Sequence, residues 1–412
     1  MEKKLFDILK ERGYVKDLTH EQEIIDLING EPFVFYLGID PTADSLHIGH
    51  FFALTMFRWL QDFGHKGIIL VGGATALIGD PTGKSDMRKM LSLEEVDYNK
   101  REVKELVKRF VRTDGDNPAI IVDNADWIMD HTYVDFMRDI GVHFNVNNML
   151  SAECYKKRLE QGGLTFLEMG YMLMQAFDFV HLNKEFGCKL QIGGSDQWGN
   201  ILAGVDLSRK IGFSEGVKID PLFGFVCPLL LKADGEKMGK TATGTLWVSR
   251  EKTSSFDFFQ AWINSFDEDV ERSLAFFTRM EMDEVRKLCQ KDIREAKKVL
   301  AFEVTKLVHG EEEAINARKV SEELFSNKGI SDNMSFINIS KDKLGINIID
   351  LLIETNLVTS KSEARRLIEQ NGISLNQEKV SSVDKVINLE DLNDNFIVIQ
   401  KGKKVFLKVI FE

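Results

Sequence analysis

Residues 40–50 have the sequence DPTADSLHIGH, and this stretch lies between an apolar run and a helical pattern. Residues 33–39 are apolar and aromatic over the length of a strand, whereas residues 51–63 repeat apolar side chains at helical spacing. The pattern predicts a strand followed by a helix with Asp44 or Ser45 as its N-cap. His47 and His50 then lie on one side of a helix N-terminus, where unpaired N–H groups favour a polyphosphate.

Short apolar runs bounded by glycine alternate with helical segments from residue 33 to about residue 231. These runs cover residues 33–39, 67–71, 119–122, 189–192 and 225–231. The alternation predicts an α/β fold with a Rossmann-like, doubly wound and mostly parallel sheet. Ligands bind beyond the carboxyl ends of the strands in such folds. Small and acidic residues occupy those ends here, among them Gly38, Asp40, Asp123, Gly194 and Asp196.

The residue composition and the apolar periodicity change after residue 245, which we take as the end of the sheet domain. Residues 246–328 are rich in Glu, Lys, Ala, Leu and Phe at helical spacing and predict an α-helical domain. Residues 329–343 are polar and irregular, as a linker would be. Residues 344–412 begin with two helical patterns and end in alternation at 396–400 and 405–411, so they predict a small α+β domain.

Composition sets bounds on the class of protein. A chain of 412 residues with 43% apolar and 29% charged residues is typical of a soluble protein with two or three domains. The absence of a long apolar run and of a signal-peptide core predicts a cytoplasmic protein without membrane segments. The four cysteines lie far apart, which favours reduced thiols over a zinc site or disulfides. The net charge of −12 disfavours nucleic acid unless basic residues cluster locally.

A second motif, KMGKT at residues 237–241, follows a strand-like run and lies in a loop that begins at residues 233–235. The two motifs together resemble the signatures of class I aminoacyl-tRNA synthetases. The resemblance to bacterial tyrosyl-tRNA synthetases is closer and covers nearly the whole chain. It rests on Tyr36, Gly38 and residues 40–50, 71–75, 79–81, 191–200 and 306–310.

The resemblance implies a ligase that activates L-tyrosine with ATP and Mg²⁺ and then transfers the amino acid to the 3′ end of tRNA(Tyr). Charge develops on phosphate oxygens, so the reaction needs placed cations and donors rather than a covalent nucleophile or a structural metal. The expected cradle for the phosphates comprises Thr42, His47, His50, Lys237, Lys240 and Thr241. Lys84 and Arg88 could reach the pyrophosphate from a second segment, although an exposed basic loop is an equal alternative.

Several glycines and carboxylates are expected around the nucleotide. Gly49 lets a flat ring approach the backbone closely. Gly38 and Gly194, which lie at strand ends, are also expected to bind ATP. Asp40 and Asp196 suit ribose hydroxyls or Mg-ATP, although such carboxylates often only cap a helix.

The amino-acid pocket is expected to contain Tyr36, Asp80, Tyr171, Gln175, Asp178 and Gln197. Tyr171, Gln175 and Asp178 have helical spacing within residues 169–180 and share one face. By resemblance, Tyr36 and Asp178 meet the phenolic hydroxyl, whereas Asp80, Tyr171 and Gln175 hold the ammonium group. A hydrogen-bonded core position is the alternative for each residue.

Residues 360–376 resemble a small RNA-binding domain also found in a ribosomal protein and in pseudouridine synthases. The expected RNA contacts are Lys361, Arg365, Arg366, Lys401, Lys403 and Lys404. A solvated helix face is the alternative, because Glu363 and Glu369 lie among the basic residues.

The family resemblance also implies a homodimer formed through an insertion at about residues 127–167. Phe136, Met137, Phe144 and Met149 are the expected apolar contacts, and a place in the core is equally open for them. Two other functions remain as alternatives: a tryptophanyl-tRNA synthetase, which shares both signatures, and a synthetase-derived RNA-binding or splicing factor.

Overall fold

The computed structural model describes residues 3–82, 90–161, 163–216, 220–241, 244–325, 336–376, 378–393, 395–402 and 405–412. The chain divides into two compact units. The first comprises Met1–Gly239 and Arg272–Glu284, and the second comprises Lys240–Glu271 and Val285–Glu412. The boundary at residue 239 differs from the expected boundary at 245, and residues 272–284 leave the helical stretch to join the first unit.

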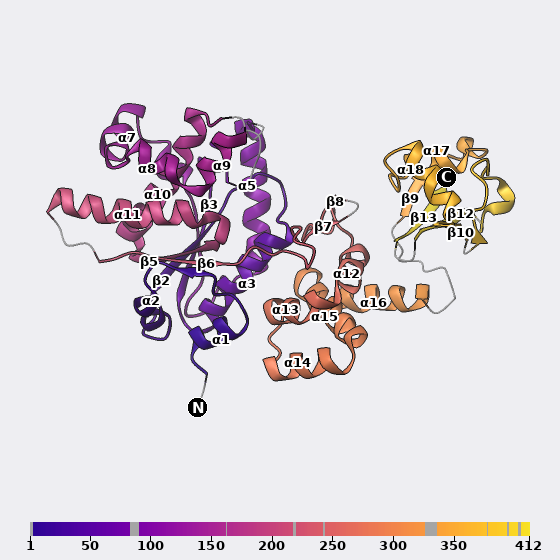
Figure 1. Cartoon of the computed structure of the whole chain (residues 1–412), viewed down its shortest axis with the longest axis horizontal. Coiled ribbons are helices and arrows are strands. Elements are labelled where there is room, and N and C mark those ends of the chain that lie inside the picture. The colour runs from indigo at the N-terminus through magenta and orange to yellow at the C-terminus, as the bar shows by residue number, and fades with distance from the viewer. Residues whose placement is uncertain are drawn as a thin grey trace. The chain divides into compact units, whose positions relative to one another are not determined.

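A six-stranded sheet forms the centre of the first unit, in the order β1-β6-β5-β2-β3-β4 (Figure 1). Its strands are β1 (Asp17–Leu18), β2 (Val34–Ile39), β3 (Lys66–Val71), β4 (Ile120–Asp123), β5 (Cys188–Gly194) and β6 (Phe223–Cys227). Only β1 runs antiparallel to its neighbour. The predicted mostly parallel, doubly wound sheet is therefore confirmed.

Helices cover both faces of this sheet because its strands are apolar on both sides. Phe35 of β2 packs on Phe57 of α3 (Ile48–Asp62), whereas the next residue, Tyr36, packs on Phe179 of α10 (Phe166–Phe186). Successive strand residues point to opposite faces, so α3 and α10 lie on opposite sides. α5 (Leu93–Lys108) also contacts β3, and α11 (Trp198–Glu215) contacts β5 and β6.

The remaining helices of the first unit are short. They are α1 (Leu5–Glu11), α2 (Glu21–Ile28), α4 (Thr75–Ile78), α6 (Ala125–Ile128), α7 (Tyr133–Asp139), α8 (Val146–Ser151) and α9 (Glu153–Gln161). Residues 272–284 are held here by Arg12, whose guanidinium donates to the carbonyls of Ala275, Thr278 and Met280 at 2.8, 3.0 and 2.5 Å. These bonds explain why part of the predicted helical stretch belongs to the sheet unit.

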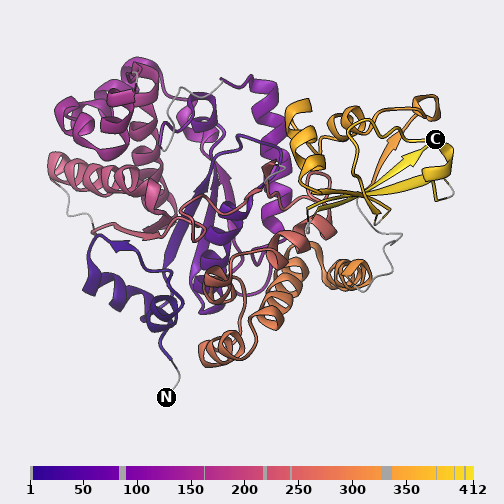
Figure 2. The same ribbon diagram turned by 45° about the vertical axis from the view of Figure 1, so that its right-hand side comes forward.

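The second unit contains a helical part and a small α+β part (Figure 2). Its helical part includes α12 (Ser255–Ile263), α15 (Ile293–His309) and α16 (Glu311–Phe325), together with most of α14 (Met282–Lys291). α13 (Asp267–Phe277) begins in this unit and ends in the first one. In the described part of the chain, no helix is long and apolar enough to span a bilayer.

The C-terminal sheet has five strands in the order β11-β10-β12-β13-β9. They are β9 (Phe336–Ile339), β10 (Ile373–Leu375), β11 (Glu378–Lys379), β12 (Phe396–Lys401) and β13 (Val405–Phe411), and they share a core with α17 (Ile348–Glu354) and α18 (Lys361–Glu369). β9 pairs in parallel with β13. The linker expected at 329–343 is therefore wrong over residues 336–339, which are a strand of this domain.

Candidate active site

Helix α3 begins at the histidine motif, and His47 is its N-cap. The Nδ1 atom of His47 accepts hydrogen bonds from the backbone N–H groups of Gly49 and His50 at 3.1 and 3.3 Å. The expected cap at Asp44 or Ser45 is therefore wrong. Ser45 lies too early to reach the first turn, and its hydroxyl donates to the carbonyl of Leu46 instead.

The two imidazoles stack with their centroids 3.8 Å apart and an interplanar angle of 11°. The Nδ1 of His50 accepts from the backbone N–H of His47 at 3.4 Å, so each ring uses Nδ1 as an acceptor. The neutral rings then carry their protons on Nε2. A β-carbon added to Gly49 would lie 3.0 Å from Cε1 of His47, so the flat ring that approaches Gly49 belongs to the protein itself.

Asp178 on α10 is the most deeply buried carboxylate of the site, with 2% of the residue exposed. Its two oxygens accept hydrogen bonds from the side-chain amide of Asn124 at 3.0 Å and from the indole N–H of Trp127 at 2.8 Å. Burial is the main cause that raises the pKa of Asp178 to about 7, and these two bonds oppose the rise.

Tyr36 also faces this buried region from β2. Its hydroxyl has no hydrogen-bond partner among the described residues, and only 1% of the residue is exposed. Burial and then the charge of Asp178 raise the pKa of the Tyr36 phenol well above its usual value. The structure thus places a phenol and a carboxylate close enough to interact, within an apolar surrounding.

A chain of hydrogen bonds connects Asp178 to Asp40. The amide of Asn124 also donates to the hydroxyl of Thr75 at 3.1 Å, and that hydroxyl donates to Asp40 at 2.7 Å. The second oxygen of Asp40 accepts from the hydroxyl of Tyr171 at 2.8 Å. A β-carbon at Gly72 would lie 2.0 Å from Asp40 Oδ1, so this close approach requires glycine.

A second group of polar residues surrounds Asp80. Its carboxylate accepts from the amide of Gln197 at 2.7 Å, and Gln197 in turn accepts from Asn200 at 3.1 Å. Burial, followed by repulsion from Asp80, raises the pKa of Asp196, whereas Lys237 lowers it. Asp80 also acts on the pKa of Tyr171. The two groups of polar residues therefore form one electrostatically continuous site.

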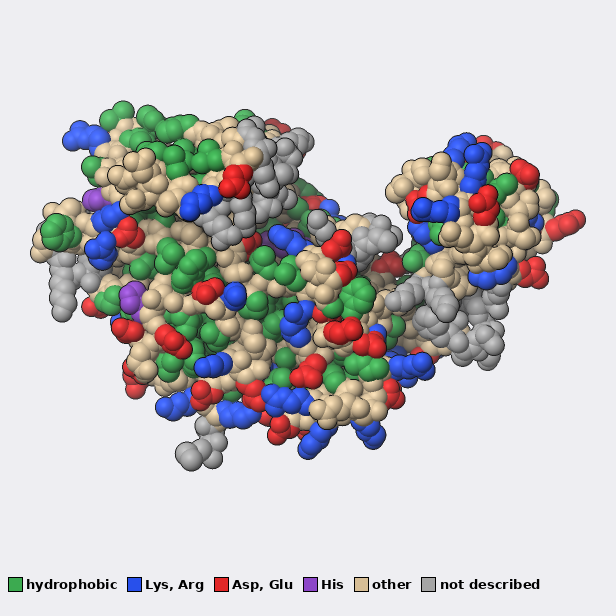
Figure 3. Space-filling model, in the orientation of Figure 1, with side chains coloured by type: hydrophobic (Ala, Val, Ile, Leu, Met, Phe, Trp, Pro, Cys, Tyr) green, Lys and Arg blue, Asp and Glu red, His purple; other side chains and the backbone are tan. Residues whose placement is uncertain are grey.

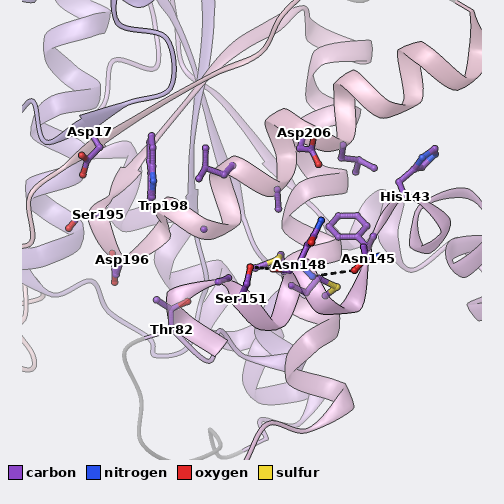
Figure 4. Close-up of a pocket in the computed structure, with 18 of the residues that line it drawn as sticks. Asp17, Thr82, His143, Asn145, Asn148, Ser151, Ser195, Asp196, Trp198 and Asp206 are labelled. Atoms are coloured by element: carbon purple, nitrogen blue, oxygen red, sulfur yellow. Dashed lines mark hydrogen bonds between the residues drawn. The ribbon is translucent and has the colours of Figure 1, made fainter. Parts of the chain in front are cut away.

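A cavity of about 730 Å³ opens next to this site. Thr82, Ser195, Asp196 and Lys237 line it near the site, and His143, Asn145, Asn148 and Ser151 are among its other lining residues. Figure 4 shows Asn148 and Ser151 of α8 together with Trp198 and Asp206 of α11 around this cavity. Its lining includes Met149, Met172 and Leu207, so the cavity combines polar groups with an apolar surface.

Several predicted site residues fall outside the described part of the chain, and others take no part in the hydrogen bonds given above. Lys84, Arg88, Lys403 and Lys404 fall outside the described residues, and the side chains of Lys240 and Thr241 are likewise not described. The described residues of the phosphate cradle are Thr42, His47, His50 and Lys237. Of the remaining predicted residues, Gly38 is exposed at the end of β2, Gly194 ends β5, and Gln175 has a buried Oε1 without a partner in the described structure.

The predicted RNA residues differ in what they contact. Lys401 donates to the carbonyl of Leu357 at 2.7 Å and to Glu363 at 3.0 Å, and Lys361 pairs with Asp350 at 2.7 Å. Arg365 and Arg366 are exposed on α18. The last two residues are therefore better placed than Lys401 to contact a polyanion.

Sequence reasoning missed three residues of the pocket. Asn124 and Trp127 hold Asp178, although we assigned no role to Asn124 and placed Trp127 only at the start of the dimer insertion. Gln191 pairs in register with Tyr36, is 3% exposed and has a buried Oε1 without a partner among the described residues. The signal for Gln191 was an amide within an otherwise apolar strand.

Comparison with known proteins gives matches along the whole chain. The family described as tRNA synthetases class I (W and Y) matches residues 29–326, and the tyrosine–tRNA ligase SYY-like C-terminal domain matches residues 327–409. The tyrosine–tRNA ligase of Clostridium tetani is 51% identical over 99% of both chains, and that of Acetivibrio thermocellus is 49% identical over 98% of both.

Solved structures agree with these matches. A C-terminally truncated mitochondrial tyrosyl-tRNA synthetase of Aspergillus nidulans superposes with a TM-score of 0.70 at 30% identity, covering 79% of this chain and 95% of that one. A tryptophanyl-tRNA synthetase of Encephalitozoon cuniculi gives 0.54 at 16% identity over 76% of this chain and 87% of that one, which shows a shared fold alone.

The fold and the family match define a class I aminoacyl-tRNA synthetase. Within that class, the chain belongs to the tyrosine–tRNA ligase family, because both family domains and its full-length relatives are of that kind.

Proposed function

We propose that the chain activates L-tyrosine with ATP, forming tyrosyl-adenylate and pyrophosphate, and then transfers tyrosine to the 3′ end of tRNA(Tyr). The observation that carries the choice of amino acid is the buried pair of Asp178 and Tyr36. A phenolic hydroxyl can donate to the carboxylate of Asp178 and accept from the hydroxyl of Tyr36. Phenylalanine would leave both groups unpaired and is rejected for that reason.

The ammonium group of the substrate lies, in this proposal, among Asp80, Tyr171 and Gln175. Asp80 supplies the opposite charge, and the buried Oε1 of Gln175 supplies an acceptor. Gln197 orients Asp80 through its 2.7 Å bond, so it acts on the ammonium group indirectly. Gln191 is close enough to Tyr36 to complete the polar lining.

The phosphates of ATP bind, in this proposal, at the start of α3. The inferred Nε2 protons of His47 and His50 provide donors, the helix N-terminus adds a partial positive charge, and Thr42 lies in the preceding loop. Lys237, and by sequence Lys84, Arg88, Lys240 and Thr241, would supply charge from loops. Donors that meet the phosphates as charge develops stabilise the transition state more than the ground state.

In this proposal, carboxylates of the site bind the ribose and face the Mg²⁺ that accompanies ATP. Asp196 follows β5 and lines the cavity, so its carboxylate oxygens can accept from ribose hydroxyls. Gly38 leaves the backbone open beside the nucleotide, because a β-carbon there would meet no atom closer than 4.0 Å, whereas His47 approaches Gly49 and Asp196 approaches Gly194. We propose that Mg²⁺ arrives on the phosphates of ATP, since this cation prefers phosphate and carboxylate oxygens and keeps several waters. Asp40 and Asp44 are the two described carboxylates within residues 40–50.

The tRNA is proposed to contact the C-terminal domain through Arg365 and Arg366, with Lys361 next to them. The match of residues 327–409 to a tyrosine–tRNA ligase C-terminal domain supports this role. We also propose that the protein works in the cytoplasm.

We also propose a homodimer. Phe136, Phe144 and Met149 pack in a core cluster to which α7, α8, α9, α10 and α11 contribute, so they are weak candidates for the interface. Other apolar side chains of the insertion are more than half exposed: Met129, Tyr133, Val134, Val142, Val146 and Phe166. Apolar surface gathers over α7 and α8 (Figure 3). A patch of this kind marks an interface, and sedimentation of the purified protein tests it.

The test of the function is ATP–pyrophosphate exchange with tyrosine, tryptophan and phenylalanine offered separately. Exchange with tyrosine alone supports the proposal, whereas exchange with tryptophan would assign the pocket to the sister enzyme. Charging of total tRNA follows, with the full chain and with a chain that ends at residue 325. Because β9 belongs to the C-terminal domain, a deletion beginning at residue 344 would leave one strand behind.

A further inference from the structure

The helix α5 carries one polar side chain within an otherwise apolar buried face. The buried residues of this helix are Val96, Asn99, Val103 and Val107, which follow one another at helical spacing. Asn99 is 8% exposed, so its amide must be satisfied inside the protein. If the residue at this position served only to pack the helix, an apolar side chain would do so as well as Asn99.

The hydrogen bond of Asn99 leads to the loop that precedes the two histidines. Its Nδ2 donates to the carbonyl of Pro41 at 3.1 Å, across 58 residues of sequence. Proline has no N–H group, so the carbonyl is the one backbone polar group that Pro41 offers. Pro41 is buried between Asp40 and Thr42, and the backbone N–H of Thr42 donates to the carbonyl of Asp40 at 2.8 Å.

Other bonds hold both ends of this connection. On the loop side, Asp40 accepts from Thr75 and Tyr171 at 2.7 and 2.8 Å. On the helix side, Lys100 pairs with Asp123 at the carboxyl end of β4 at 2.9 Å, and Lys104 approaches the same carboxylate at 3.6 Å. The side chain of Asp123 is only 6% exposed, so this anchor lies largely out of water. Lys100 and Lys104 thus fix helix α5 to the end of β4. Asn99 connects the same helix to Pro41 in the segment 40–47, which we call the phosphate loop.

We infer that Asn99 is a positioning residue for the ATP-binding side of the site. It touches no substrate in the proposed function, on which this inference rests. It holds Pro41 so that Thr42, and the chain leading to His47, keep the position that the phosphates require. A displacement of about 1 Å in such a loop can cost roughly 100-fold in rate. The bonds that hold Asp178 come from Asn124 and Trp127 and involve neither Pro41 nor Asn99, so tyrosine affinity should change little.

Two variants of Asn99 separate its donor from its volume. Asn99→Ala removes both, whereas Asn99→Asp keeps the shape of the side chain and replaces the donor by an acceptor at neutral pH. The matched control is Val103→Ala, which removes buried volume from the same face of α5 and leaves Asn99 intact; Val103 is 1% exposed.

The experiment measures tyrosine-dependent ATP–pyrophosphate exchange as a function of ATP concentration in the full-length protein. Tyrosine affinity without ATP and the melting temperature are measured on the same samples. For both Asn99 variants we expect kcat/KM for ATP to fall roughly 10- to 100-fold, with tyrosine affinity within about threefold of wild type. Val103→Ala should lower the melting temperature and leave kcat/KM for ATP within about threefold.

Unchanged ATP kinetics in Asn99→Ala would overturn the positioning role. So would an equal loss of tyrosine affinity, or a loss in Val103→Ala as large as in the Asn99 variants, since either result indicates a general structural role. Wild-type protein that fails to exchange with tyrosine would overturn the proposed function as well, so the two failures are distinguishable.

Discussion

The proposed tyrosine-binding half and the proposed phosphate-binding half of the site are built in opposite ways. Asp178 and Tyr36 are at most 2% exposed, and side chains from α6 and from the end of β4 hold the carboxylate in place. His47 and His50 instead lie half-buried at a helix end, where their rings cap the first turn, while Lys237 is exposed on a loop.

This difference follows from what each half must do. Rejecting phenylalanine requires polar groups that are already desolvated, because an unpaired buried group is costly. Stabilising phosphate charge requires donors and cations that point outward and can move towards the ligand. In the proposed function, specificity therefore depends on buried groups, and the chemistry depends on groups that are half-buried or exposed.

The largest effect should come from His50→Ala. Loss of one donor to the developing phosphate charge should slow tyrosyl-adenylate formation roughly 100- to 1,000-fold, with tyrosine affinity nearly unchanged. Pre-steady-state activation and equilibrium binding of tyrosine measure the two quantities. Ser254→Ala removes a helix cap in the other unit and controls for lost stability, which should be about 1 kcal/mol. Equal losses in binding and rate would break the separation of the two halves.

Asp178→Asn should lower kcat/KM for tyrosine by about 100-fold, because the acceptor for the phenol is weakened. It should also change the pH dependence of stability. The folded carboxyl keeps its proton up to a pKa of about 7, against 3.8 when unfolded. The stabilisation that the raised pKa of Asp178 gives to the folded state is therefore fully present below pH 3.8 and is lost as the pH rises through 7.

The wild type should consequently lose roughly 2 kcal/mol of unfolding free energy relative to Asp178→Asn between pH 5.5 and pH 8. Urea unfolding of both proteins at the two pH values measures this difference. A difference that is the same at both pH values would show that the carboxyl is ionised throughout.

Tyr36→Phe should act on stability and specificity in opposite directions. Removing a buried hydroxyl without a described partner should raise the unfolding free energy by about 1 kcal/mol, while discrimination between tyrosine and phenylalanine falls roughly tenfold. Tyr155→Phe is the matched control, since its hydroxyl donates to the carbonyl of Met169 at 3.2 Å. That variant should lose stability and keep its discrimination. A destabilised Tyr36→Phe would contradict the proposed pocket.

The smallest effect is expected for Thr75→Val, which tests whether the halves communicate. Its hydroxyl lies between Asp40 and Asn124, so it connects the phosphate loop with the carboxylate of Asp178. We expect KM to rise about threefold for both ATP and tyrosine, consistent with one modest hydrogen bond on each side. An effect on one substrate alone would mean that the two halves are independent.

Patterns with a fixed period predicted the fold well. The apolar runs became β2 to β6, and the helical spacing of Tyr171, Gln175 and Asp178 became one face of α10. Period-2 and period-3.6 patterns reflect local geometry, so they can be read without knowing the fold. The strand β9 was not predicted, because it is one short run whose pairing partner, β13, lies about 70 residues later in the chain.

The candidate site was predicted in part. The motifs indicated which residues belong to it, but the partners of those residues were wrong or missing in several places. His47 caps its own helix instead of Asp44 or Ser45, because a ring can fold back onto the first turn. Lys401 bonds to Glu363 and Leu357, which are distant in sequence. Asn124 and Trp127 reach Asp178 only because β4 ends next to α10.

The sequence by itself determined the order of elements, the family and the inventory of polar groups, since these depend on local pattern and residue type. The tertiary structure decided which of those groups are buried and to what they bond. That decision sets the raised pKa of Asp178 and the link from Asn99 to Pro41. Burial and hydrogen bonding depend on segments that meet only when the sheet is assembled, and no local pattern contains that information.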